Sequence, residues 1–275
     1  MHALPILAIL GSALLHATWN AVLKRRKDTT AAAMLLVVGA GLISAVLTFA
    51  VGPADVPAGA LPWVGAVALS EGLYFFFLSK SLQELPLGSA YGLSRGGGLL
   101  VTWPISIALL SETINARILI GGGVLTLGLF VSVTTVGSRK GLMWTVLCAC
   151  MVGLYPVFYK QSLGMGVSPY PLFCLSLLGS VPIQVLLLGA HPWARLRNEL
   201  RVRPLVLALT CAVTAASFLL LLWALRFVGA GRITALRNTS VLFAYAFGWL
   251  AGERLTARSA IASVAITVGA VLLSL

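Results

Sequence analysis

The stretch LSRGGGLLVTWPISIALLSETI, residues 93–114, places one full charge, Arg95, ahead of three glycines and a long apolar run. A charged side chain inside an apolar span is costly unless it faces the interior of a bundle or an aqueous cavity. A related stretch, ALRNTSVLFAYAFGWLAGERL, returns at residues 235–255, where a one-residue gap aligns Arg95 with Arg237. The return of a charge in the same apolar setting indicates two copies of one unit.

The whole chain has the composition of an integral membrane protein. Of its 275 residues 59% are hydrophobic and 9% are charged, against about 25% charged in soluble proteins. Lipid cannot satisfy unpaired backbone amides, and no stretch alternates like a barrel strand, so an all-α fold is predicted. Glycine, proline or clustered charge marks each break. Ten transmembrane helices are expected, at about 4–23, 30–51, 62–83, 88–110, 118–137, 142–162, 170–190, 204–226, 232–251 and 259–275.

The two halves of the chain are predicted to be inverted repeats. The stretch TWNAVLK (18–24) lies over LYPVFYK (154–160), which aligns Trp19 with Tyr155. Each half then holds five spans, and an odd number inserts the second copy in the opposite orientation. Inverted repeats are typical of secondary transporters, whose substrate site lies near the midplane where the halves meet. The predicted domains are residues 1–137 and residues 138–275.

Lysine and arginine predict the orientation, because they are enriched in cytoplasmic loops. The odd-numbered loops hold twelve of them and the even-numbered loops three, so both termini are expected on the non-cytoplasmic side. The net charge of +12 comes largely from this excess of lysine and arginine on the cytoplasmic side, where it attracts anionic lipid. No nucleic-acid partner is therefore expected. The twelve are Lys24, Arg25, Arg26, Lys27, Arg139, Lys140, Arg195, Arg197, Arg201, Arg203, Arg254 and Arg258, and the three are Arg117, Arg226 and Arg232.

Several short motifs resemble the EamA-type members of the drug/metabolite transporter superfamily. They are HATWNAVLKRRKD at the end of the first span, AYGLSRGGG in the fourth, and a glutamate closing the fourth and ninth spans (LLSE and LAGE). The resemblance covers the whole chain and implies ten helices in a 5+5 arrangement. It also implies a carrier for small metabolites in the cell membrane, often an exporter of amino acids or related compounds. The family's repeats often have proline early in helix four, where this chain has GGG and then Pro104.

Arg95 is the first candidate for the substrate cavity. In a helix over 88–110 it lies about 11 Å from the start, at 1.5 Å per residue. Tyr91 and Ser94 share its face. The following glycines permit close backbone approach or the local unwinding found at transporter sites. The alternative is tight helix packing around an arginine that snorkels to the interface.

Other spans carry polar or aromatic side chains at helical spacing. Interhelical hydrogen bonding or ordinary packing is the alternative for each of them. Arg237 lies nearer to its interface than Arg95, so a lipid-headgroup or loop contact is its alternative. The remaining candidate substrate-binding residues are His16, Trp19 and Asn20, then Glu71 and Tyr74, then Tyr155, and finally Arg237 and Asn238.

Glu71 is the one acidic residue deep within a span, and it is the candidate for proton coupling. A loop of about five residues makes helices three and four antiparallel neighbours, which predicts a pair between Glu71 and Arg95. The alternative is a static ion pair. Glu112 and Glu253 end equivalent helices of inverted halves, so we expect them on opposite faces, capping the following helix or anchoring a loop. Lys24 and Lys160 are expected to snorkel at span ends.

The predicted substrate is a small polar or zwitterionic metabolite with an anionic group, because arginine forks suit a carboxylate. Alternatives are a hydrophobic cationic drug with Glu71 as counter-ion, and uptake or exchange rather than export. A membrane enzyme would need His16, Glu71 and a serine within hydrogen-bond reach, and a channel would need a continuous pore. Neither an enzyme activity nor a cofactor or metal is expected, protons are the candidate coupling ion, and the protein is expected to be a monomer or homodimer.

Overall fold

The structure is a computed structural model that describes residues 3–51, 55–111, 116–133, 137–253 and 256–274. All the regular secondary structure in these ranges is helical, so the predicted all-α membrane fold is confirmed. Among the described residues, seven helices are long and apolar enough to cross a membrane. They are α1 (Ala3–Lys24), α2 (Thr29–Val51), α3 (Leu61–Glu84, preceded by the short η1, Ala58–Ala60), α4 (Leu87–Leu110), α6 (Arg139–Gly164), α7 (Pro169–Leu188) and α9 (Pro204–Leu225).

Two predicted spans are the shorter apolar helices α5 (Ala116–Val133) and α12 (Ala257–Ser274). The span expected at 232–251 is instead two helices, α10 (Ala230–Arg237) and α11 (Ser240–Leu250). A further helix, α8 (Pro192–Arg201), lies in the long basic loop. The predicted spans therefore all contain helix, while the number of membrane crossings stays a prediction.

The break between α10 and α11 lies at Asn238 and Thr239. Both residues are poor helix formers because their side chains bond to nearby backbone. The Thr239 hydroxyl donates to the Leu236 carbonyl at 2.9 Å, and the Asn238 amide donates to the Arg95 carbonyl at 3.2 Å. In the first half, α4 runs unbroken through its three glycines, so local unwinding at those glycines was the wrong alternative.

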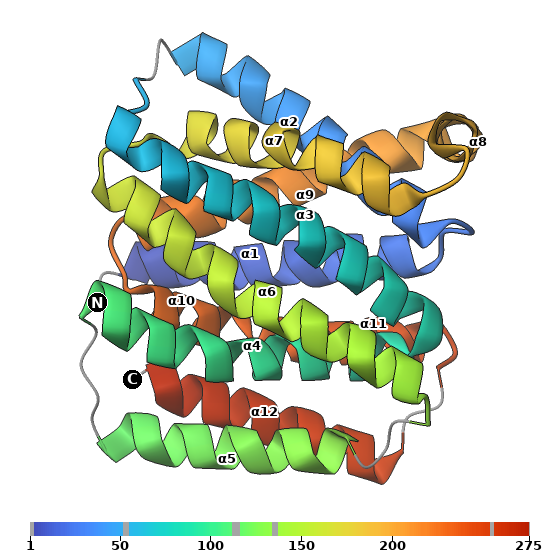
Figure 1. Cartoon of the computed structure of the whole chain (residues 1–275). Helices are drawn as coiled ribbons and strands as arrows, with labels where there is room; N and C mark the ends of the chain where they lie inside the picture. Colours follow the sequence, from blue (N-terminus) through green and yellow to red (C-terminus); the bar gives the residue numbers. More distant parts are fainter. Residues whose placement is uncertain (1–2, 52–54, 112–115, 134–136, 254–255, 275) are drawn as a thin grey trace.

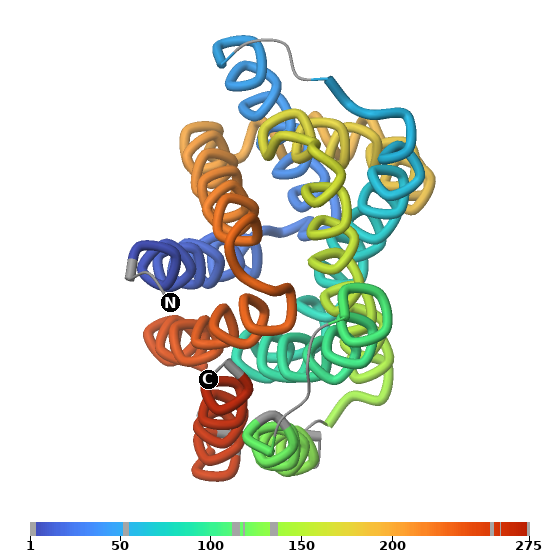
Figure 2. The backbone as a smooth tube through the Cα atoms, turned by 90° about the vertical axis from the view of Figure 1, so that its left-hand side faces the viewer, coloured from blue at the N-terminus to red at the C-terminus, as the bar shows by residue number. Residues whose placement is uncertain are grey.

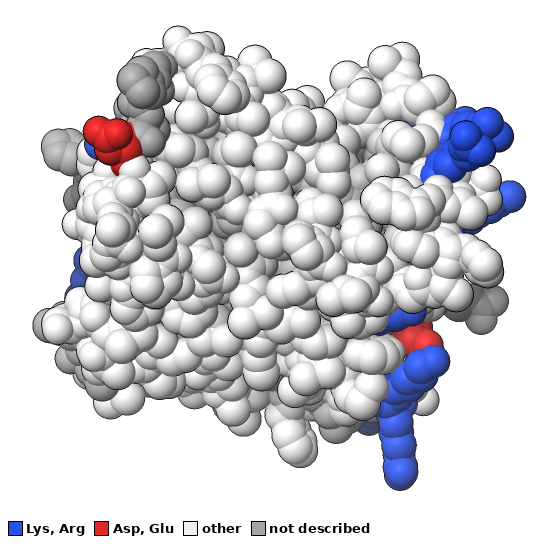
Figure 3. Space-filling view, turned by 45° about the horizontal axis from the view of Figure 1, so that its top comes forward, with Lys and Arg blue, Asp and Glu red and all other residues white. Residues whose placement is uncertain are grey.

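The helices lie side by side with their ends gathered at two opposite faces (Figures 1 and 2). Both ends of the chain lie at the left of Figure 1, while α8 and the loop after α1 lie at the right. We call the latter the basic end, defined by residues 24–29, 137–141 and 189–203. Figure 3 shows most of the lysine and arginine side chains of one face gathered at this end, on a surface that is otherwise largely uncharged. The odd-numbered loops thus share one end, as the inverted-repeat prediction requires.

Helix packing repeats when the two halves are exchanged. In the first half, α3 and α4 both pack on α6, the first helix of the second half. In the second half, their equivalents α9 and the α10–α11 pair both pack on α1, the first helix of the first half. The pairs α2–α7 and α5–α12 join helices at equivalent places in the two halves. This pattern supports the predicted inverted repeat. The boundary between residues 137 and 138 and the twofold axis remain proposals, testable by superposing the halves.

Two lysines at matching places in the halves make matching contacts. Lys24 Nζ donates to the Leu82 and Leu85 carbonyls, at 2.5 and 2.7 Å, where α3 ends. Lys160 Nζ donates to the Leu225 carbonyl at 2.6 Å, where α9 ends. The last carbonyls of a helix lack intrahelical partners, so these lysines satisfy helix ends. Their expected snorkelling to the membrane interface stays a prediction.

Glu253 caps a helix of the other half. Its two carboxylate oxygens accept from the Leu87 backbone N–H at 2.9 and 3.0 Å, at the start of α4. A carboxylate is favoured at a helix N-terminus, where N–H groups are unpaired. The capping role was therefore predicted correctly for Glu253, although the capped helix is α4 rather than the following one. Glu112 lies outside the described residues.

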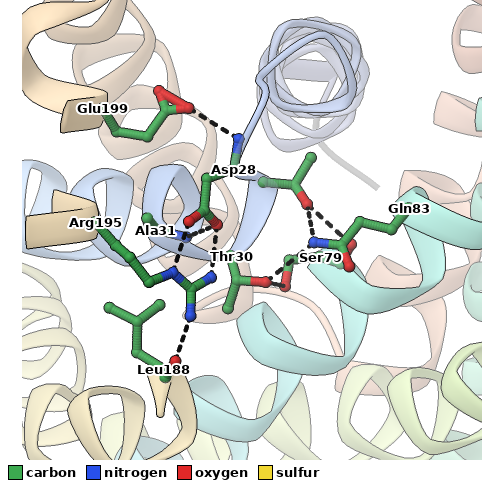
Figure 4. A network of polar contacts seen from close by, with 9 residues as sticks. Asp28, Thr30, Ala31, Ser79, Gln83, Leu188, Arg195 and Glu199 are labelled. Atoms are coloured by element: carbon green, nitrogen blue, oxygen red, sulfur yellow. Dashed lines mark hydrogen bonds and ion pairs between the residues drawn. The ribbon is translucent and has the colours of Figure 1, made fainter. Parts of the chain in front are cut away.

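The loop after α1 and helix α8 are joined at the basic end by the polar contacts that Figure 4 shows. Arg195 donates to both carboxylate oxygens of Asp28, at 2.7 and 2.8 Å. Glu199 accepts from the Asp28 backbone N–H at 3.0 Å. Burial alone would raise the pKa of Asp28, but hydrogen bonds from Arg195 and the Ala31 backbone, with the Arg195 charge, lower it below its ordinary value. This contact links the first half of the chain to the second.

Candidate functional site

A fully buried histidine lies at the centre of the polar cluster. His16, on α1, receives the Trp19 indole N–H at Nδ1, at 3.3 Å. Arg237 Nη2 reaches the same nitrogen at 2.7 Å. On the other side of the ring, the Tyr74 hydroxyl lies 3.2 Å from Nε2, which Arg95 Nη2 also contacts. The imidazole therefore brings together side chains of α1, α3, α4 and α10.

The two arginines share a second partner, the hydroxyl of Tyr155 on α6. Arg95 Nη1 donates to it at 3.4 Å and Arg237 Nη1 at 3.1 Å. Each arginine is 1% exposed, so neither snorkels to lipid or solvent. The headgroup or loop contact considered for Arg237 is thus excluded, and the repeat places both arginines in one cluster.

The cluster holds more positive charge than its described partners neutralise. A neutral imidazole carries one N–H, so only one of its nitrogens can accept a hydrogen bond. Both nitrogens of His16 face guanidinium donors, and His16 therefore cannot satisfy both arginines. Within the described parts of the spanning helices, Glu71 is the single buried carboxylate. Two buried cations thus stand against one buried anion.

Glu71 does not pair with Arg95, so the predicted ion pair is wrong. Both Glu71 carboxylate oxygens are buried without an aligned hydrogen bond, although the Tyr159 hydroxyl lies near them. Arg237 and Arg95 lie close enough to act on Glu71 only through their charges. The reason is that α6 packs against both α3 and α4, which contact each other little. The short loop between α3 and α4 predicted that the two helices are neighbours, but α6 lies between them.

The side-chain amides of the two candidate asparagines donate to backbone carbonyls rather than to other side chains. Asn20 donates to the His16 carbonyl at 2.7 Å, and Asn238 donates across to the Arg95 carbonyl. The side-chain oxygens of both are buried without a partner. Each amide therefore keeps an unused acceptor beside the arginine cluster.

Tyr91 and Ser94 line the Arg95 face of α4 as predicted. The Arg95 guanidinium lies 5.5 Å from the centre of the Tyr91 ring, within the range of a cation–π contact. The Ser94 hydroxyl donates to the Tyr91 carbonyl at 3.2 Å, so it bonds within its own helix. Tyr91 therefore belongs to the cluster, whereas Ser94 makes no side-chain contact with another candidate.

Sequence reasoning missed the contribution of α9. Ser217 accepts from Arg237 Nη2 at 3.1 Å and donates to the Ser12 carbonyl at 2.9 Å. The Phe218 ring lies 4.8 Å from the Arg237 guanidinium carbon. Ser12 is four residues before His16, so helical spacing was a signal for it. Ser217 follows Thr210 and Thr214 at helical spacing, so a signal was present for it too, whereas Phe218 lies among apolar residues that carry none.

The cluster is closed to solvent in this conformation. A cavity of about 730 Å³ opens at the opposite end from the basic loops, where its lining includes Leu4, Tyr170, Trp223 and Arg226. None of the candidate residues lines it, and His16 and Tyr155 are fully buried. Access to the cluster therefore requires the helices to move.

Two transporter families match the chain. Residues 139–275 match the EamA-like transporter family, and residues 33–125 match the Small Multidrug Resistance protein family. The quaternary ammonium compound-resistance protein QacC of Staphylococcus aureus is 39% identical over 75 residues, which are 26% of this chain and 69% of QacC. QacG of Staphylococcus sp. (strain ST94) is 36% identical over 67 residues, 24% of this chain and 62% of QacG.

A solved crystal structure of a protein shares the fold over nearly the full length. It aligns with a TM-score of 0.66 and covers 99% of this chain and 96% of the other. The two sequences are 17% identical, so the likeness concerns the fold alone.

Proposed function

Because the chain belongs to the EamA-like transporters of the drug/metabolite transporter superfamily, we propose that it exports a small carboxylate-bearing metabolite, such as an amino acid. Its place is the cell membrane, which it crosses several times. Transport proceeds by alternating access between two inverted halves. The observation that carries the proposal is the pair of buried arginines around His16.

A substrate carboxylate supplies the negative charge that this cluster lacks. A guanidinium presents paired N–H groups in a planar fork that matches a carboxylate. Arg95 and Arg237 converge on shared partners, so one anion can meet both. Trp19, Tyr74 and Tyr155 provide aromatic walls for the remainder of the substrate. Such a site favours a zwitterion over a cation, since two guanidiniums repel a positive group.

Export of a quaternary ammonium compound is the second candidate. It is supported by the likeness to QacC and by Glu71, whose carboxylate has no aligned hydrogen-bond partner. Aromatic rings attract such cations through their faces. In this alternative Glu71 is the counter-ion, and the arginines oppose rather than assist binding.

Transport by the purified full chain in proteoliposomes separates the two candidates. Labelled amino acids and a labelled quaternary ammonium compound are offered to the wild type, Arg95→Gln, Arg237→Gln and Glu71→Gln. We expect amino-acid transport whose KM rises roughly tenfold or more in either arginine variant, because a charged hydrogen bond is lost. Arg197→Gln, an exposed arginine of α8, is the control. Quaternary ammonium transport that survives Arg95→Gln and fails in Glu71→Gln would instead establish the second candidate.

Proton coupling through Glu71 is the remaining part of the proposal. A buried carboxylate without a fixed ion-pair partner can gain and lose a proton as the site opens to each side. Wild-type transport is then expected to vary with pH. A Glu71→Gln protein that still exchanges substrate should have lost that dependence. Transport insensitive to pH in the wild type would remove Glu71 from the mechanism.

A further inference from the structure

A buried polar stripe follows one face of α7. Ser176, Ser180 and Gln184 recur every four residues and are 0%, 0% and 5% exposed. The stripe faces α3, because a Cβ added at Gly72 would lie 3.2 Å from the Ser180 Cβ. Gly72 directly follows Glu71. The stripe therefore packs on α3 one residue from the buried carboxylate.

Tyr159 lies between the stripe and Glu71 at one end. The Tyr159 hydroxyl lies 2.9 Å from the Ser176 hydroxyl, and the same Tyr159 lies near the Glu71 carboxylate. One turn further along α7, Gln184 Nε2 donates to Ser180 Oγ at 2.9 Å. The hydroxyls of Ser176 and Ser180 donate to carbonyls of their own helix, at 3.1 and 2.6 Å. The gap between them is one helical turn, about 5–6 Å, a distance that the proposed route needs one bridging water to span.

The other end of the stripe reaches the basic end of the molecule. Helices α3 and α7 run in the same direction, and both end on the right of Figure 1. Gln184 lies one turn before Leu188, whose carbonyl accepts a hydrogen bond from Arg195. Arg195 is part of the network with Asp28 in Figure 4, which is partly exposed. The polar side chains of α7 thus lie in a row between the basic end and Tyr159.

We propose that Gln184, Ser180, Ser176 and Tyr159 form a proton route between the basic end and Glu71. The proposal rests on the proposed function only in taking Glu71 as the proton acceptor. One proton enters from solution at the basic end. Each hydroxyl and each bridging water passes its own proton forward and takes one from behind, while Gln184 orders the entry water. The Glu71 carboxylate becomes a carboxylic acid, and every relay group returns to its starting state.

The other groups around Glu71 do not offer an alternative relay. Arg95 on α4 and Arg237 on α10 keep their protons at any ordinary pH. His16 on α1 is engaged by both arginines and by Tyr74. Helix α2 has no titratable side chain, and α7 has only Tyr170 and Cys174. A second polar group joins the end of α3 to α2 through hydrogen bonds from Ser79 to Thr30 and from Gln83 to Thr29. It begins about two turns from Glu71, whereas the stripe bonds to Tyr159, which lies near the Glu71 carboxylate.

Infrared difference spectroscopy after a pH jump measures the route without any substrate. The purified full chain is used, and protons are the probe. The carboxyl band that Glu71→Gln removes identifies Glu71. We expect Tyr159→Phe, and the double variant Ser176→Ala with Ser180→Ala, to slow the appearance of this band by at least about tenfold. Ser70→Ala is the matched control, because Ser70 is buried next to Glu71 and its hydroxyl bonds only to backbone carbonyls, whereas Ser176 and Ser180 also bond to side chains.

Each outcome decides the proposal. Slowing in the stripe variants, with an unchanged rate in Ser70→Ala, supports the route. Wild-type rates in the double variant, equal slowing in Ser70→Ala, or the absence of a Glu71 band overturns it. Circular dichroism and size-exclusion profiles check that the variants are folded. If the route variants behave as expected but the wild type transports no amino acid, the substrate assignment fails while the route stands.

Discussion

At the scale of single residues, the cluster depends on the shape of its cations as well as their charge. Arg95→Lys keeps a positive charge but replaces a planar fork by a point charge that cannot reach two partners in fixed geometry. We expect the fold to remain and KM for a carboxylate substrate to rise by roughly tenfold. Substrate counterflow in proteoliposomes measures KM, and thermal unfolding in detergent checks the fold. An unchanged KM would show that Arg95 is a packing residue.

Asp28 makes stability depend on pH. Its folded-state pKa is lowered, so the folded protein binds this proton less tightly than the unfolded chain, whose aspartate pKa is about 3.9. The stabilisation is complete above about pH 5 and disappears as pH falls through the lowered folded value. Because the side chains of Asp28 and Arg195 are 27% and 32% exposed, their ion pair contributes about 1 kcal/mol or less to the free energy of unfolding.

Thermal unfolding of wild type and Asp28→Asn from about pH 6 to pH 3 tests this expectation. The variant should be less stable at the upper end, and the difference between the two proteins should shrink as pH falls. A difference that grows with acidity would contradict the assigned ion pair.

Much of the residue cluster could be predicted because charged and aromatic side chains are conspicuous in apolar helices. His16, Tyr74, Arg95, Tyr155 and Arg237 do meet in three dimensions. The partner of an individual charge could not be predicted, because it depends on which helix lies between two others. Glu71 and Arg95 are the example, separated by α6 despite the short loop that joins their helices.

At the scale of helices, α4 and α6 approach closely through glycine. A Cβ on Gly153 would lie 2.7 Å from the Gly98 carbonyl oxygen and 2.5 Å from the Val101 Cβ. Backbone cannot move aside as a side chain can, so Gly153→Ala should destabilise the protein by about 1–3 kcal/mol. Gly122→Ala on α5 is the matched control, because nothing lies within 4 Å of its added Cβ.

Unfolding in detergent with added denaturant compares the two glycine variants. The control should be neutral or slightly stabilising, since alanine is the better helix former. If both variants lose stability equally, glycine is not required for the contact between α4 and α6.

Helix positions could be predicted from apolar length, but helix interruptions could not. Glycines in α4 suggested unwinding there, yet their effect is close packing. The interruption falls at Asn238 and Thr239, where local side-chain bonds and the contact to the Arg95 carbonyl replace helical ones. Helix α8 was missed because its charges indicate a loop unless its amphipathic spacing is also considered.

At the scale of the whole molecule, the predicted orientation places both termini outside the cell. Cysteines introduced singly at residue 2 and at Arg197, in a variant without native cysteines, are exposed to a membrane-impermeant thiol reagent in intact cells. We expect labelling at residue 2 and none at Arg197, because lysine and arginine favour the cytoplasmic side. After permeabilisation both positions should react. Labelling of Arg197→Cys in intact cells would reverse the orientation.

The two ends of the molecule are held by different kinds of contact. The ion pairs between described residues, Asp28 with Arg195, Arg26 with Glu199, and Glu84 with Lys140, all lie at the basic end. Dissolved salt screens exposed charges over a Debye length of about 8 Å at physiological ionic strength. The ionic strength of the compartment that faces the basic end therefore acts most on the exposed Glu84–Lys140 pair and least on the buried Arg26–Glu199 pair. We expect added salt on the side of the membrane that faces the basic end to weaken the exposed ion pairs, and the same salt on the opposite side to leave them unchanged.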